Sequence, residues 1–153
     1  HDIKKLPLAV STNDDGVLEF AQRGEIVPIF QSLGNELGTP KLLSCPEYSE
    51  RKPTKDFVSM KAFNISYFIG IDAAETNINT ILSGDRNITN DFKPSRGLLE
   101  LTTNQMVGFT KEIHNETGNI LLADGSVQQV SSARLRSEIL PNTGVTTNRV
   151  LLP

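Results

Sequence analysis

One early segment of the chain has the apolar spacing of an amphipathic helix. Its apolar residues recur three or four positions apart and lie on one helical face. These residues are Ile26, Ile29, Phe30, Leu33 and Leu37. Pro28 is compatible only with the first turn, so we expect the helix to begin near residue 26. Gly38 followed by Pro40 is a stop signal. The preceding segment, VLEFA, fits either a strand or an earlier helical turn.

After residue 60 the pattern changes to short runs rich in β-branched and aromatic residues, which is typical of strands. The clearest run covers 64–71 and is closed by Gly70. A short strand followed by a polar loop is predicted over 80–91. Four more strands are predicted over 97–103, 106–113, 118–123 and 126–130.

The C-terminal part contains one more helical signal. The segment 131–140 begins with Ser at a plausible N-cap, has Leu135 and Ile139 four apart, and should stop at Pro141. The tail that follows is turn-rich, with few apolar residues at its end. The predicted fold is a single α+β domain over 1–153, with an N-terminal helix packed on an antiparallel β-sheet and a short C-terminal helix.

Charge and composition exclude several functions. The net charge is -3 and no basic stripe is visible, so nucleic acid is not an expected partner. Cys45 is the single cysteine, which rules out an intrachain disulfide and a Cys-rich zinc site. We interpret Cys45 as a small, half-buried apolar residue, with a nucleophile as the alternative. No run of about 18 apolar residues exists in this chain.

The stretch HNETGNILLADGSVQQV raises the question of a His–Asp catalytic pair. Asp124-Gly125 is a strong signal for a two-residue type I′ hairpin turn, in which Leu122 would face Val127 on the core side. If 107–113 pairs with 119–123, His114 lies in the turn at the opposite end of the hairpin. Five strand positions separate the two residues by roughly 17 Å, whereas a catalytic hydrogen bond needs about 3 Å. A dyad is therefore not expected.

A metal site is a second interpretation. The chain has two histidines, so zinc is disfavoured, but calcium requires only oxygen-rich loops. The loop near GDRNITND offers Asp85, Asn87, Asn90 and Asp91 as ligands, and the loop at 13–15 offers more acidic and amide oxygens. Neither loop has EF-hand spacing, and a solvated polar loop is the alternative for each. The neighbouring Asp85–Arg86 pair is polar enough for a site, and its alternative is an ordinary surface or loop-ordering pair.

His114, nine further residues and then Asp124-Gly125 also form a family signature, H-x9-DG. The pattern resembles prepilin-like, type II secretion pseudopilin-like proteins of verrucomicrobia, planctomycetes and their relatives. Further stretches resemble the same group in the same order, and the resemblance extends over most of the chain from Val17 onward. These stretches are NELGTPKLLSCPE (35–47), NISYFIGIDA (64–73), LSGDRNIT (82–89), GNILLADGSVQQV (118–130) and TNRVLLP (147–153).

The resemblance implies a structural, non-catalytic function. Relatives carry a basic leader, a peptidase site and a hydrophobic helix that anchors the precursor in the bacterial inner membrane. This chain starts at His1 without those elements, so we expect it to be the periplasmic domain of a longer protein. The implied partners are other pseudopilin subunits and secretion-system proteins, and the isolated domain should be monomeric or weakly associating. Major pseudopilins often carry calcium in a C-terminal loop, but the resemblance identifies no residues for it here.

Two alternatives remain. The first is an enzyme or periplasmic ligand-binding module, which requires Asp85, Arg86 and His114 to converge in one concave pocket. The second is a glycan- or protein-binding module grown from a pilin-like scaffold, which the fold alone would not separate from a filament subunit.

Overall fold

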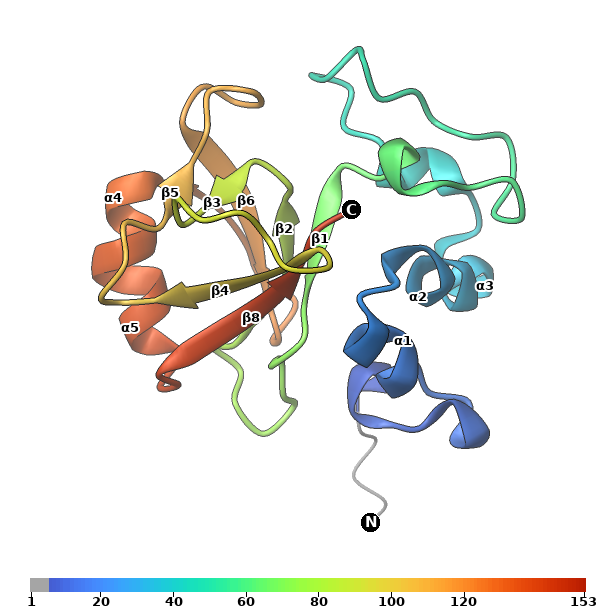
Figure 1. The fold of residues 1–153 in the computed structure, drawn as a ribbon, viewed down its shortest axis with the longest axis horizontal. Coiled ribbons are helices and arrows are strands. Elements are labelled where there is room, and N and C mark those ends of the chain that lie inside the picture. The colour runs from blue at the N-terminus through green and yellow to red at the C-terminus, as the bar shows by residue number, and fades with distance from the viewer. Residues whose placement is uncertain (1–5) are drawn as a thin grey trace.

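The computed structural model describes residues 6–153 and contains a six-stranded antiparallel sheet with short helices on both sides (Figure 1). The strands of this sheet stand in the order β4-β8-β1-β2-β6-β7. They are β1 (Tyr67–Gly70), β2 (Ile81–Asp85), β4 (Leu98–Thr102), β6 (Thr117–Leu122), β7 (Val127–Ser131) and β8 (Thr147–Leu151). Two further short strands, β3 (Ile88–Thr89) and β5 (Gly108–Phe109), pair with each other. The predicted α+β class with an antiparallel sheet is confirmed.

The middle of the sheet packs against a core on each face, since successive side chains of a strand point to opposite sides. Phe68 and Val150 point into one core, where they meet the C-terminal helix through Leu135 and Leu140. Ile69 points the other way, into a second core formed with the N-terminal helices. The result is three layers, with the sheet in the middle, as Figure 1 shows.

The prediction of a single N-terminal helix from residue 26 to Gly38 is wrong. A helix does begin at Ile26, but α2 (Ile26–Ser32) is followed by a separate turn of helix, α3 (Gly34–Leu37). Two local features account for the break. The Ser32 hydroxyl donates to the Ile29 carbonyl, which competes with the helix ladder, and glycine is a poor interior helix residue. The VLEFA segment forms another short helix, α1 (Leu18–Arg23).

Other short helical turns complete the N-terminal layer. These 3-10 turns are η1 (Pro7–Ala9), η2 (Thr12–Asp14), η3 (Pro40–Leu43) and η4 (Ala62–Asn64). Buried side chains of this layer, among them Val17, Ile29 and Leu43, pack together with Ile65 and Ile69. No helix among residues 6–153 is both long and apolar enough to cross a membrane.

The C-terminal helix begins as predicted and ends later. Ser131 is the N-cap, and its hydroxyl accepts a hydrogen bond from the Arg134 N–H. The helix continues through Pro141, because α4 (Ser132–Arg134) widens into a π-helical turn, η5 (Leu135–Ile139), before α5 (Leu140–Asn142). In this wider turn the Leu140 N–H bonds to Leu135 O, five residues back. Proline strains a regular α-helix through contact with the carbonyl four residues earlier, and widening relieves such contacts.

The tail of the chain is not a turn-rich end but a central strand. β8 lies between β4 and β1, and its register places Arg149 opposite Glu100 and Leu151 opposite Ile69. The Arg149 guanidinium also bonds to Asp72, with its Nη2 2.6 Å from Oδ1. The tail has only a short apolar run, and its pairing partners are distant in sequence, so periodicity gave no signal for this strand.

The hairpin at Asp124-Gly125 forms with a different register from the predicted one. Val127 pairs with Leu121, not with Leu122, and it is 66% exposed. The Leu122 N–H donates to Ser126 O, which leaves a three-residue loop over 123–125, and the Gly125 N–H donates to Leu122 O. Gly125 has φ +86°, whereas Asp124 does not adopt positive φ. This is a type I turn followed by a left-handed residue, the usual three-residue hairpin.

We expect Gly125→Ala to lower the free energy of unfolding by about 1 kcal/mol, because the new Cβ would strain a left-handed backbone. A Cβ at this position would meet nothing within 4 Å, so sterics against neighbours do not contribute. Gly125→Asn is the matched control and should lose less, since Asn tolerates this conformation. Urea unfolding measures both changes. Equal stability of the alanine variant and wild type would mean that the turn has another conformation in solution.

Candidate functional site

Three chemically active side chains from distant segments meet at one place. The Cys45 Sγ lies 3.6 Å from His114 Nε2, and the Asp85 Oδ2 lies 3.5 Å from the same nitrogen. Cys45 and Asp85 are buried, at 5% and 1% exposure. The His114 side chain is 18% exposed and forms the open side of the group. We call these three residues the thiol–imidazole cluster.

Cys45 is held at the cluster by Ser66, the residue before β1. The Ser66 N–H donates to Leu43 O, and the Ser66 hydroxyl accepts a hydrogen bond of 2.9 Å from the Cys45 N–H. Ser66 O in turn accepts from the Arg86 N–H. The segment after η3 is thereby fixed against β1 and the end of β2, which brings Cys45 near the residue that closes β2, Asp85.

Asp85 is positioned by β6. Its Oδ2 accepts hydrogen bonds from the Asn119 backbone N–H at 2.6 Å and from Asn119 Nδ2 at 3.0 Å. A buried carboxylate needs such donors to offset its lost hydration. Because Asn119 alone supplies two of them, Asp85 is held in place independently of His114.

His114 lies in a strained turn between β5 and β6. His114, Asn115 and Glu116 have φ values of 53°, 50° and 64°, a left-handed conformation that costs roughly 1–2 kcal/mol for each residue with a Cβ. Hydrogen bonds hold the turn in this shape. The Thr117 hydroxyl donates to His114 O, and the Glu116 N–H donates to Thr110 O.

The Asn87 side chain also stabilises this turn. Its Nδ2 lies within hydrogen-bonding distance of three backbone carbonyls, those of Thr110, Ile113 and Thr117. The amide nitrogen thus donates to backbone carbonyls, whereas the buried Oδ1 has no hydrogen-bond partner. Asn87 was one of the candidate oxygen ligands of the loop, and in the structure its amide nitrogen holds the His114 turn.

Arg86 turns away from the cluster toward Glu112. Its two terminal nitrogens bond to the Glu112 carboxylate at 3.2 and 3.1 Å, and its guanidinium stacks 4.2 Å from the Tyr48 ring centre. The Tyr48 hydroxyl donates to Glu112 as well. Arg86, followed by the Tyr48 hydroxyl, lowers the pKa of Glu112. Of the three residues whose convergence the enzyme alternative requires, Asp85 and His114 meet and Arg86 does not join them.

Asp91, another candidate oxygen ligand of the loop, makes a local contact of its own. Asp91 lies exposed in the turn after β3, where its N–H donates to the Thr89 hydroxyl. Among residues 6–153, no three His, Cys, Asp or Glu side chains are arranged to hold a metal ion. Asp85 and Asp91, predicted to share a site, therefore belong to different local structures.

Asp124 and His114 lie at opposite ends of β6, as the strand argument predicted. The reason differs in part, because β6 pairs with β2 and β7 and not with the segment 107–113. Asp124 accepts hydrogen bonds from the Ser126 hydroxyl and N–H, and these bonds lower its pKa. It serves the hairpin turn.

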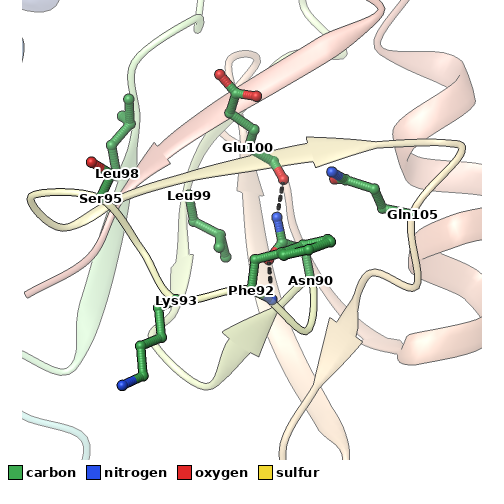
Figure 2. A pocket seen from close by; sticks show the side chains of 8 residues that line it. All are labelled: Asn90, Phe92, Lys93, Ser95, Leu98, Leu99, Glu100 and Gln105. Carbon is green, nitrogen blue, oxygen red and sulfur yellow. Dashed lines mark hydrogen bonds between the residues drawn. The ribbon is translucent and has the colours of Figure 1, made fainter.

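A recess of about 290 Å³ lies beside the edge strand β4 (Figure 2). Asn90 Nδ2 donates to Glu100 O at 2.6 Å, and Asn90 Oδ1 accepts from the Phe92 N–H. Figure 2 shows the Gln105 side chain reaching toward Asn90, whereas the Glu100 carboxylate and Lys93 point away from it. Asn90 therefore forms a hydrogen bond with a backbone carbonyl of the edge strand β4. Covering an edge strand in this way protects it from pairing with other chains.

The pairing of Cys45 with His114 is the feature that sequence reasoning missed. We expected Cys45 to be a half-buried apolar residue, with a nucleophile as the alternative, and the structure places a buried thiol next to an imidazole. Cys45 and His114 are 69 positions apart, and no short motif links them. Chemically, one ring nitrogen faces both a sulfur and a carboxylate, so neutral His114 can serve only one of them at a time.

Comparison with known proteins gives no relative for this chain: no family model, no curated protein and no solved structure matches it.

We expect Glu112→Gln to weaken the pH dependence of stability in acid. A carboxyl whose pKa is lowered by folding stabilises the protein above its ordinary value of 4.5, and this contribution is lost as the pH falls through the lower folded value. The variant should lose about 1 kcal/mol at pH 7, because the Glu112 side chain is half-exposed although Arg86 is buried and Gln still offers an acceptor, and it should approach wild type as the pH is lowered. Urea unfolding between pH 7 and acid measures the difference, and a constant offset at every pH would contradict the assignment.

Proposed function

We propose that this chain is a non-catalytic, pseudopilin-like subunit of a type II secretion or type IV pilus-like filament. The observation on which the proposal rests is the ordered set of motifs along the chain, headed by the H-x9-DG signature. The positions of the signature residues support a structural role. His114 and Asp124-Gly125 lie in the two turns that bracket β6, and β6 joins β2 to β7.

The apolar surface between the N-terminal layer and the sheet supports the same proposal. A cavity of about 400 Å³ lies there, lined almost entirely by apolar side chains. Its lining includes Leu8, Phe30, Leu37, Ile69 and Leu82. A cavity of this size and polarity suits the side chains of a further apolar helix.

In the proposed full-length protein, a hydrophobic helix precedes His1 and anchors the domain in the bacterial inner membrane, on the periplasmic side. Other pseudopilin subunits and secretion-system proteins are the partners. Assembly then depends mainly on that helix, so the domain by itself is monomeric or weakly associating.

One observation favours the enzyme alternative: Cys45, His114 and Asp85 come together although they are distant in sequence. Two features argue against a Cys–His–Asp catalytic triad. In such a triad the nucleophile and the carboxylate contact different ring nitrogens, whereas both contact Nε2 here. Cys45 is also 95% covered, which leaves little room for an extended substrate.

The first test is the genomic sequence upstream of residue 1. We expect a short basic leader, a prepilin peptidase site and about 20 apolar residues, the length that spans a membrane. The full-length protein, expressed in its own cells, should fractionate with the inner membrane, and residues 1–153 alone should not. An upstream sequence without any hydrophobic segment would overturn the proposal.

The second test separates a filament subunit from an enzyme. Deletion of the gene should abolish secretion or filament formation, and the Cys45→Ser variant should restore it fully. A thiol-dependent enzyme would instead lose its function with Cys45→Ser while remaining folded. Thermal unfolding of the variant provides the folding control.

A further inference from the structure

The structural role proposed above leaves the thiol of Cys45 unused. The two contacts at His114 Nε2 differ in kind. A separation of 3.6 Å is normal for a hydrogen bond to sulfur, whereas 3.5 Å exceeds the usual range for N–H···O bonds. Since Asp85 Oδ2 already accepts two hydrogen bonds from Asn119, we take the hydrogen-bonded pair at this site to be the Cys45 thiol and the His114 imidazole.

Asp85 adds a fixed charge to this pair. When the imidazole takes the thiol proton, it becomes a cation 3.5 Å from a buried carboxylate, and that attraction is strong where water is excluded. The neighbouring guanidinium of Arg86 is bound to Glu112. The Tyr67 phenol also lies near the cluster, and burial, followed by Cys45 and Asp85, raises its pKa, so it remains protonated.

The small exposure of the Cys45 thiol limits the size of the reagent that can reach it. Cys45 is 5% exposed, and the neighbouring His114 side chain, at 18%, is the more open member. With so little of the thiol exposed, a reagent that reacts with the sulfur has to be small, and a peptide or other large substrate does not fit. The chain has no second cysteine with which Cys45 could form an internal disulfide.

We propose that Cys45 is an oxidant-reactive thiol whose reagent is a small hydroperoxide, with His114 as its base. His114 Nε2 accepts the thiol proton, and the sulfur attacks the terminal peroxide oxygen. The S–O bond forms as the O–O bond breaks, and the leaving hydroxide or alkoxide takes a proton from His114 and departs as water or an alcohol. The sulfur is oxidised by two electrons to a sulfenic acid, and the peroxide is reduced. This assignment is independent of the filament proposal.

The experiment uses the whole 153-residue chain, hydrogen peroxide as the oxidant and dimedone to trap the sulfenic acid, with intact-mass detection. We expect the native protein to form the adduct faster than the same chain unfolded in urea. Burial alone would make the native thiol slower, so this comparison separates activation from exposure. Cys45→Ser should form no adduct.

The role of the base is tested by His114→Asn, which suits the left-handed backbone at this position. We expect its oxidation rate to fall by about a hundredfold, the low end of the loss for a removed general base. Asp85→Asn should give a rate between that variant and wild type. Asp91→Asn, a matched Asp-to-Asn change at an exposed position outside the cluster, should react like wild type, and thermal melts verify the fold of each variant.

Equal rates for wild type and folded His114→Asn would overturn the proposal. So would a native thiol that reacts no faster than the unfolded one. This second comparison needs no variant and therefore decides the question even if His114→Asn does not fold.

Discussion

The hydrogen bonds from Asn119 to the buried Asp85 carboxylate are the interaction on which the rest of the site depends. Burying a carboxylate without donors costs several kcal/mol or changes its protonation, so β2 and β6 must stay in the register that brings Asn119 to it. That register places Gly84 opposite Ile120. It also fixes the point where the chain leaves β2, and with it the positions of Arg86 and Asn87.

From this point, polar contacts extend into the turn before β6. Asn87 contacts three carbonyls of the turn, and the Arg86–Glu112–Tyr48 group packs beside it. Together they hold three consecutive left-handed residues, which a flexible loop would not retain. The imidazole of His114 is thereby placed against Cys45. Its position depends on a left-handed backbone that these hydrogen bonds stabilise.

The pseudopilin-like proposal and the thiol proposal concern different parts of this arrangement. The former rests on the motif order and on the apolar cavity between the N-terminal layer and the sheet. The latter rests on one ring nitrogen and its two neighbours. A filament subunit with a peroxide-sensitive thiol is physically consistent, because the cavity lining and the thiol–imidazole cluster share no residue.

The sequence by itself determined the features that depend on neighbouring residues. These include the strand at β1, the Ser131 N-cap, the start of a helix at Ile26 and the turn at Asp124-Gly125. Each follows from local backbone preferences. Only the tertiary structure decided that the tail becomes a central strand, that Val127 faces solvent and that Cys45 meets His114. These outcomes depend on contacts between segments tens of residues apart, whose free energy arises from shared burial and hydrogen bonding that no local pattern contains.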